Sequence, residues 1–211
     1  MAGAVHVLVE HGRTKTFASA LDWPGWARSA KGAHDALEML EAYRSRYAGV
    51  LTAHSVSAPE GRLLVVATVP GDATTDFGAP SQVCDADRRA LRSADRARLA
   101  AILRACWAGL DDAVARTGLL RPGPRGGGRS VSRIAEHVTG AEVAYARKLG
   151  LRIVASQGDD RTDALRARIL TVLDGTQPAD RDGAWPLRYG VRRIAWHACD
   201  HLFEIEDRAT S

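Results

Sequence analysis

The chain has 211 residues, 45% of them hydrophobic, which is enough apolar material for one large or two small globular domains. Its net charge of +4 comes mostly from Arg residues interleaved with Asp and Glu; this pattern argues against direct nucleic-acid binding, which needs a concentrated basic face. No apolar run reaches the roughly 18 residues of a membrane span, and the first residues lack the apolar stretch of a signal peptide, so we expect a cytoplasmic protein with no membrane partner.

The first eighty residues alternate between strand and helix signals. Leu and Met residues at helical spacing predict one helix at residues 33–47, and a Pro-Gly turn at 24–25 separates two of the extended segments. Runs of β-branched and apolar residues predict strands at residues 5–9, 15–21, 27–30 and 62–69. Together these elements predict a small α+β domain over residues 1–80.

The remainder of the chain has a helical pattern throughout. Residues 71–80 are rich in Gly, Pro, Asp and Thr and are the predicted linker. Beyond it, apolar residues recur at helical spacing, interrupted by a Gly-rich loop and a polar loop. The predicted helices span residues 87–117, 130–149, 161–173 and 191–208. Four helices in this length predict an all-α four-helix bundle over residues 81–211.

Two of the predicted helices begin with the same pattern, V-x-R-I-A-x-H. It occurs at residues 131–137 and again sixty residues later at 191–197. In each helix the closing histidine lies at the edge of the apolar stripe, and His201 follows His197 by about one helical turn. We therefore expect His137, His197 and His201 to meet at one place between the two helices.

Three converging imidazoles are typical of a site for one divalent metal ion. Zinc binds imidazole nitrogens at about 2.0–2.1 Å, and three protein ligands leave at least one coordination position open, as in catalytic sites. Three imidazoles suit zinc, nickel, iron and copper alike. Several carboxylates lie near enough in the sequence to hold an imidazole N–H, and the pattern does not choose among Glu136, Glu142, Asp200 and Glu204.

The other histidines and the cysteines have structural interpretations. We expect surface or structural roles for His6, His11, His34 and His54. The cysteines are widely spaced and form no CxxC pair, which is typical of free thiols in a reducing compartment: Cys84, Cys106 and Cys199. Because Cys199 lies about 200° around the helix from His197, we expect a core thiol that points away from the ion.

Two segments carry a resemblance to known families. Ile134–Glu142 (IAEHVTGAE) and Arg193–Leu202 (RIAWHACDHL) resemble the DinB/YfiT-like family of metalloenzymes over residues 85–208. Members are four-helix bundles, often dimeric, and hold nickel, zinc or a similar ion on three histidines. The resemblance maps those ligands onto His137, His197 and His201. More weakly, residues 5–69 resemble the HicB-like fold, through the segment ALDWPGW at 20–26.

The resemblance implies a thiol-dependent S-transferase or isomerase that activates a low-molecular-weight thiol such as mycothiol at a zinc or nickel ion. The partner is then a small-molecule substrate, and a homodimer is expected. The side chains expected to shape the pocket or hold a carboxylate are Tyr145, Trp196, Arg188, Arg192 and Arg193, although a solvated helix face is the more ordinary explanation of each arginine. Two alternatives stay open: a non-catalytic binding or regulatory module stabilised by the metal, and a metal-dependent hydrolase.

Overall fold

A four-stranded sheet forms the N-terminal part of the computed structural model, which describes residues 3–122, 128–153 and 160–210. The strands are β1 (Ala4–His11), β2 (Thr16–Ala20), β3 (Ala27–Ala30) and β4 (Arg62–Pro70), in the spatial order β3-β2-β1-β4. The pairs β1–β2 and β2–β3 are antiparallel, whereas β4 returns parallel to β1. All four predicted strands are therefore present, with ends that differ by no more than two residues.

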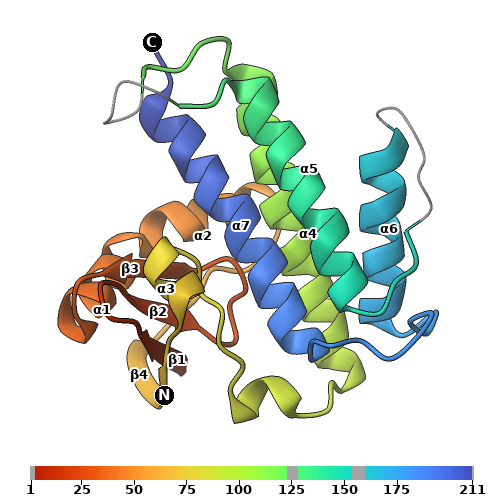
Figure 1. Ribbon diagram of the computed structural model, residues 1–211, viewed down its shortest axis with the longest axis horizontal. Coiled ribbons are helices and arrows are strands. Elements are labelled where there is room, and N and C mark those ends of the chain that lie inside the picture. The colour runs from red at the N-terminus through yellow and green to blue at the C-terminus, as the bar shows by residue number, and fades with distance from the viewer. Residues whose placement is uncertain (1–2, 123–127, 154–159, 211) are drawn as a thin grey trace.

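Both faces of this sheet are covered. Side chains alternate along a strand, so Ala18 faces the opposite side from its neighbour Phe17. Phe17 packs edge-on against Trp196 of α7 (Leu187–Arg208), with ring centroids 6.0 Å apart. Helix α1 (Ala33–Ala42) packs against β2 and β3, and in Figure 1 it lies on the far side of the sheet from α7.

The prediction of one helix over residues 33–47 is wrong. Two helices occupy this region, α1 and α2 (Arg44–Ala53), and the chain changes direction at Tyr43. Tertiary contacts explain the break: the Tyr43 ring packs against Phe203 of α7, and Tyr47 stacks on Trp26 at 5.7 Å. Hydrophobic spacing predicts which face of a helix is buried. It does not predict that residues before and after Tyr43 pack against different elements.

The predicted linker and the start of the next predicted helix also differ from the structure. Residues 71–80 contain a short helix, α3 (Ala73–Phe77), capped by the Asp72 side chain, which accepts hydrogen bonds from the backbone N–H groups of Thr74 and Thr75. A 3-10 turn, η1 (Asp85–Arg88), follows. The helix expected from residue 87 begins only at Ser93, as α4 (Ser93–Arg116).

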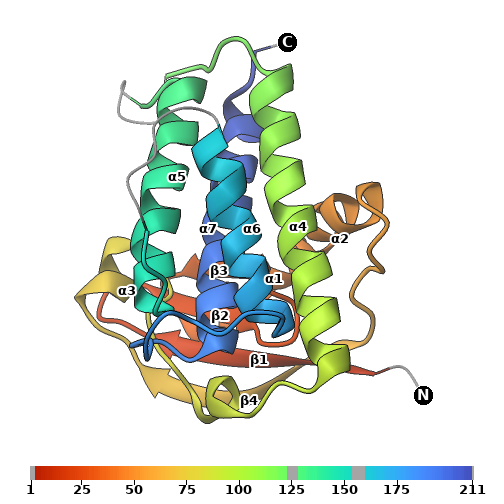
Figure 2. The same cartoon turned by 90° about the vertical axis from the view of Figure 1, so that its right-hand side faces the viewer.

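Four long helices make up the C-terminal part: α4, α5 (Val131–Lys148), α6 (Asp160–Asp174) and α7. Helix α7 contacts α4 and α5, while α6 contacts α4 and α5 from the outside. Figures 1 and 2 show α7 between the sheet and the other long helices. Most buried apolar side chains form one cluster that runs from Val5 in the sheet to Ile205 in α7, and a second, smaller cluster holds Phe17 and Trp196.

The structure is thus a mixed α/β protein with an N-terminal sheet and a helical C-terminal part, as the sequence predicts at this coarse level. Within the described ranges, no helix combines the length and apolar character needed to cross a bilayer.

Candidate metal centre

Helices α5 and α7 bring the three predicted ligands together. The Ser130 hydroxyl accepts a hydrogen bond from the backbone N–H of Arg133 at 3.3 Å and caps the start of α5. Facing apolar side chains are almost fully buried between the two helices: Ile134 and Val138 on α5, Ile194 and Ala198 on α7. The histidines at positions 137 and 197 each adjoin this apolar stripe, so the rings lie at its rim.

The three rings are arranged to share one ion. The Nε2 atoms of His137 and His197 are 3.3 Å apart. Two nitrogens bound tetrahedrally at 2.0–2.1 Å to one zinc lie about 3.3–3.4 Å from each other, so this spacing suits a common ion. The ring of His201 has its centroid 4.7 Å from that of His197 and 5.1 Å from that of His137. One ligand atom from each residue lies within 4.8 Å of the others. This cluster can hold a metal ion.

A carboxylate fixes one of the rings. Nδ1 of His201 lies 2.8 Å from Oε2 of Glu204, one turn further along α7. Glu204 in turn accepts a hydrogen bond from Arg208 at 2.5 Å. A carboxylate accepts but does not donate, so Nδ1 of His201 carries the proton and Nε2 keeps the lone pair that a metal needs. Glu204 is therefore the carboxylate that the sequence could not single out.

The other three candidate carboxylates lie elsewhere. Asp200 pairs with Arg28 of β3 at 3.1 Å. Glu142 is buried and pairs with Arg166 of α6 at 3.2 Å. Glu136 is exposed on α5. Only Glu204, among these four, contacts a histidine of the cluster.

Burial keeps two of the rings uncharged. It lowers the pKa of His197 to about 2, and the neighbouring His201, His137 and Arg193 act in the same direction. Burial and the guanidinium of Arg129 lower the pKa of His137. A neutral imidazole offers a free electron pair, which is the form that binds a metal. Nδ1 of His197 is buried and has no hydrogen-bond partner among the described residues.

Aromatic and cationic side chains border the cluster. The Tyr145 ring lies 5.8 Å from that of His197 and 5.4 Å from that of Trp185. The guanidinium of Arg193 lies 5.5 Å from the centroid of the Tyr145 ring. Arg129 is exposed and close enough to act on the pKa of both His137 and His197. The guanidinium groups would attract an anionic group bound here, and the rings would pack against an aromatic one.

Of the five predicted substrate-binding residues, the structure places three near the histidine cluster and two away from it. Tyr145 borders the cluster, as predicted. Trp196 has its ring 5.9 Å from that of His197 but is buried against Phe17 of the sheet. Arg193 stacks between Tyr145 and Trp196 and donates one hydrogen bond to the backbone oxygen of Pro80 at 2.7 Å, so it borders the cluster with one nitrogen already bound.

Arg188 and Arg192 lie away from the cluster and have other partners. Arg188 donates to Asp95 at 3.1 Å and to the backbone oxygen of Arg89. Arg192 is buried and makes a two-point ion pair with Asp87, at 2.9 and 2.7 Å. Both guanidinium groups hold the segment before α4 and its first turn rather than the surroundings of the histidines. Their places on α7, nine and five residues before His197, do not reveal which way they point.

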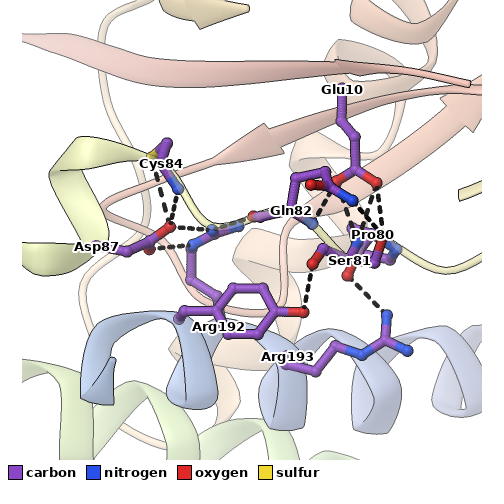
Figure 3. Close-up of polar contacts among 9 residues, drawn as sticks. Glu10, Pro80, Ser81, Gln82, Cys84, Asp87, Arg192 and Arg193 are labelled. Carbon is purple, nitrogen blue, oxygen red and sulfur yellow. Dashed lines mark hydrogen bonds and ion pairs between the residues drawn. The ribbon is translucent and has the colours of Figure 1, made fainter. Parts of the chain in front are cut away.

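A polar network that the sequence did not predict fastens residues 80–87 between the sheet and α7 (Figure 3). On the sheet side, the buried carboxylate of Glu10 accepts backbone N–H bonds from Ser81 and Gln82 at 3.0 to 3.1 Å. On the helix side, the bonds of Arg192 and Arg193 close the network. Because α7 also carries His197 and His201, this network fixes the helix that presents two of the three rings.

The remaining histidines and Cys199 lie away from the cluster, as expected. His6, His34 and His54 pair with the carboxylates of Asp22, Glu38 and Asp112. Cys199 is buried, and its sulfur and that of Cys106 both approach Gly25.

Comparison with known proteins adds no relative: no family model, no curated protein and no solved structure matches the chain. The case for function therefore depends on the geometry of the three histidines and on the groups around them.

Proposed function

We propose that the chain is a metal-dependent enzyme of the DinB-like kind, in which one divalent ion on His137, His197 and His201 activates a low-molecular-weight thiol for S-transfer or isomerisation. In this proposal α4 to α7 form a DinB-like bundle, and the preceding sheet is a HicB-like domain. The observation that carries it is the convergence of three imidazole nitrogens, from two helices, within 4.8 Å of one another.

Zinc or nickel is the proposed ion. His137, His197 and His201 would hold the ion as neutral imidazoles, and an ion held there would supply the positive charge that lowers the pKa of a bound thiol toward neutral. The chain's own residues supply the rest: Glu204 orients His201, and the guanidinium groups of Arg129 and Arg193 attract an acidic substrate. Tyr145 and Trp185 give that substrate an apolar surface.

Nothing in the arrangement singles out a base for water. Within the described ranges, Glu204 is the carboxylate in contact with the cluster, and it is engaged by His201 and Arg208. A general base must reach the proton that it takes, directly or through one water. A thiol starts from a pKa of about 8.5, so its proton can pass to the solvent near neutral pH without such a base, whereas water starts from about 15.7. For this reason we prefer the thiol reaction to hydrolysis.

Metal analysis of protein purified without a histidine tag is the first test. We expect one equivalent of zinc or nickel, and none in a variant with His137, His197 and His201 all changed to Ala. His34→Ala is the matched control, since this ring lies exposed on α1, and it should keep the full equivalent. Wild-type protein without bound metal, also after reconstitution, would refute the proposal.

Cobalt substitution tests the catalytic part. Adding mycothiol or another small thiol should change the visible spectrum as sulfur enters the coordination sphere, and thiol should be consumed in the presence of an electrophile. An ion whose spectrum no thiol alters would instead support a metal-stabilised binding module.

A further inference from the structure

Strand β4 is an edge of the sheet with no strand on its outer side in the described part of the chain. It pairs with β1 alone, and it is outermost at the bottom of the molecule in Figure 2. The strand is nine residues long, with one charged residue, Arg62. Its central side chains are strongly exposed: 42% for Leu64, 42% for Val65 and 48% for Val66. A long apolar edge of this kind is a template for pairing with another strand.

Two hollows flank this edge, one on each face of the sheet. The first, of about 560 Å³, lies toward η1 and is lined by residues 66–69 of β4 together with Leu21 and Asp85. The second lies toward α1, beside Leu63 and Leu37, and is a shallow, open depression. A strand added beside β4 points its side chains alternately to the two faces. The added strand can therefore place side chains against both faces of the sheet.

Leu64 has a position that the first hollow can accept. The register with β1 puts Leu64 level with His6, which lines that hollow, and the register shifts between Val65 and Ala67. In a second copy of β4, paired antiparallel about a twofold axis, Leu64 lies beside residues 66–69 of its partner and faces the hollow that they line. Because both copies present the same surface, the twofold axis repeats this contact.

Charge supports a second copy as the occupant. In the antiparallel arrangement the Arg62 end of one strand lies beside residues 66–69 of the other, where Asp85 lines the hollow and is exposed. The twofold axis then forms two Arg62–Asp85 pairs. A strand carrying an acidic residue in place of Arg62 would meet Asp85 with a like charge.

Proline limits the length of the pairing. The backbone N–H of Gly71 donates to the oxygen of His11 in β1, so by alternation the nitrogen of Pro70 faces the outer edge. Proline has no N–H to donate there. The pairing therefore covers residues 62–69, which are the exposed apolar part of the strand.

We propose that β4 is a homodimer interface, in which two copies pair antiparallel through residues 62–69 and the two sheets continue as one. This inference uses no metal ligand and stands apart from the proposed catalytic function.

The test is the oligomeric state of the full chain by sedimentation velocity over a range of concentrations. We expect a dimer for the wild type and a monomer for Leu64→Lys/Val66→Lys, with the dimer Kd raised at least about tenfold, because the twofold axis brings like charges together. Leu119→Lys is the matched control: it changes an apolar residue that is 75% exposed just beyond α4, and it should stay dimeric. A monomeric wild type, or a lysine variant that remains dimeric, overturns the proposal.

A cysteine variant tests the same interface without placing charges on the strand. Val66→Cys places a thiol at the centre of the pairing, while the three native cysteines are buried. Mild oxidation should give a covalent dimer for Val66→Cys but not for Leu119→Cys. Absence of the covalent dimer in a protein with a native circular dichroism spectrum also counts against the interface.

Discussion

Replacing Glu204 is the sharpest perturbation of the metal site that leaves all three ligands in place. Glu204→Ala removes the acceptor that lies 2.8 Å from Nδ1 of His201. The ring then loses the contact that keeps its proton on Nδ1 and its lone pair on Nε2, and it gains freedom to rotate. Glu204→Gln keeps a neutral acceptor at the same position and loses only the charge.

The size of the effect follows from the environment of this contact. Loss of a carboxylate that holds a ligating histidine costs about 10–100-fold in metal affinity, or about 1.4–2.7 kcal/mol. The Glu204 side chain is 34% exposed, whereas that of His201 is 10% exposed, so water weakens the contact from the glutamate side. We therefore expect the lower end: about tenfold for Glu204→Ala, and about threefold for Glu204→Gln.

The assay is a competition titration of zinc against a chromophoric chelator at pH 7.5, combined with nitrogen NMR of the His201 ring in the metal-free protein. Glu206→Ala is the matched control, because Glu206 lies two residues further along α7 and pairs with Arg46. Zinc affinity of Glu204→Ala within twofold of the wild type, together with an unchanged ring tautomer, would refute the reasoning.

Three further predictions concern stability. Arg166→Met leaves Glu142 buried without its cation and should cost about 3–5 kcal/mol in urea unfolding, whereas the double variant Glu142→Leu/Arg166→Met should recover most of it. In metal-free protein, burial lowers the pKa of His197 from 6.5 to about 2, so below pH 6.5 the unfolded chain binds a proton that the folded chain does not. The free energy of unfolding should therefore fall by up to about 1.4 kcal/mol for each pH unit below 6.5. The slope should be shallower in His197→Gln. Gly183→Ala sets a Cβ 2.8 Å from the carbonyl carbon of Leu149 and should cost about 1–3 kcal/mol by thermal unfolding, with no change if the loop moves freely.

The part of the site that the sequence predicted is the part set by local helix geometry. His197 and His201 are one turn apart on a helix whose apolar face is clear, so their common direction follows from the helix repeat alone. His137 was found because its heptapeptide repeats that of His197. Once two helices pack through equivalent stripes, equivalent positions at their edges meet.

The parts that the sequence missed depend on partners distant in the chain. The sequence favours Arg192 as a substrate-binding residue because nothing local marks Asp87, 105 residues away, as its partner. Glu204 is one of four equivalent carboxylates in the sequence, and only the orientation of the His201 ring distinguishes it. The break between α1 and α2 depends on Tyr43 meeting Phe203. In each case the deciding contact is tertiary, and periodicity carries no information about it.

The position of α7 in the chain has a consequence for synthesis. This helix follows every other element of the described structure, yet it covers Phe17 of the second strand and neutralises the buried Asp87. Until residues beyond 187 have left the ribosome, a nascent chain keeps an uncovered apolar sheet face and an unpaired carboxylate. The earlier segments therefore keep these groups exposed until α7 has been synthesised. A chain interrupted before α7 is a natural target for chaperones and proteases.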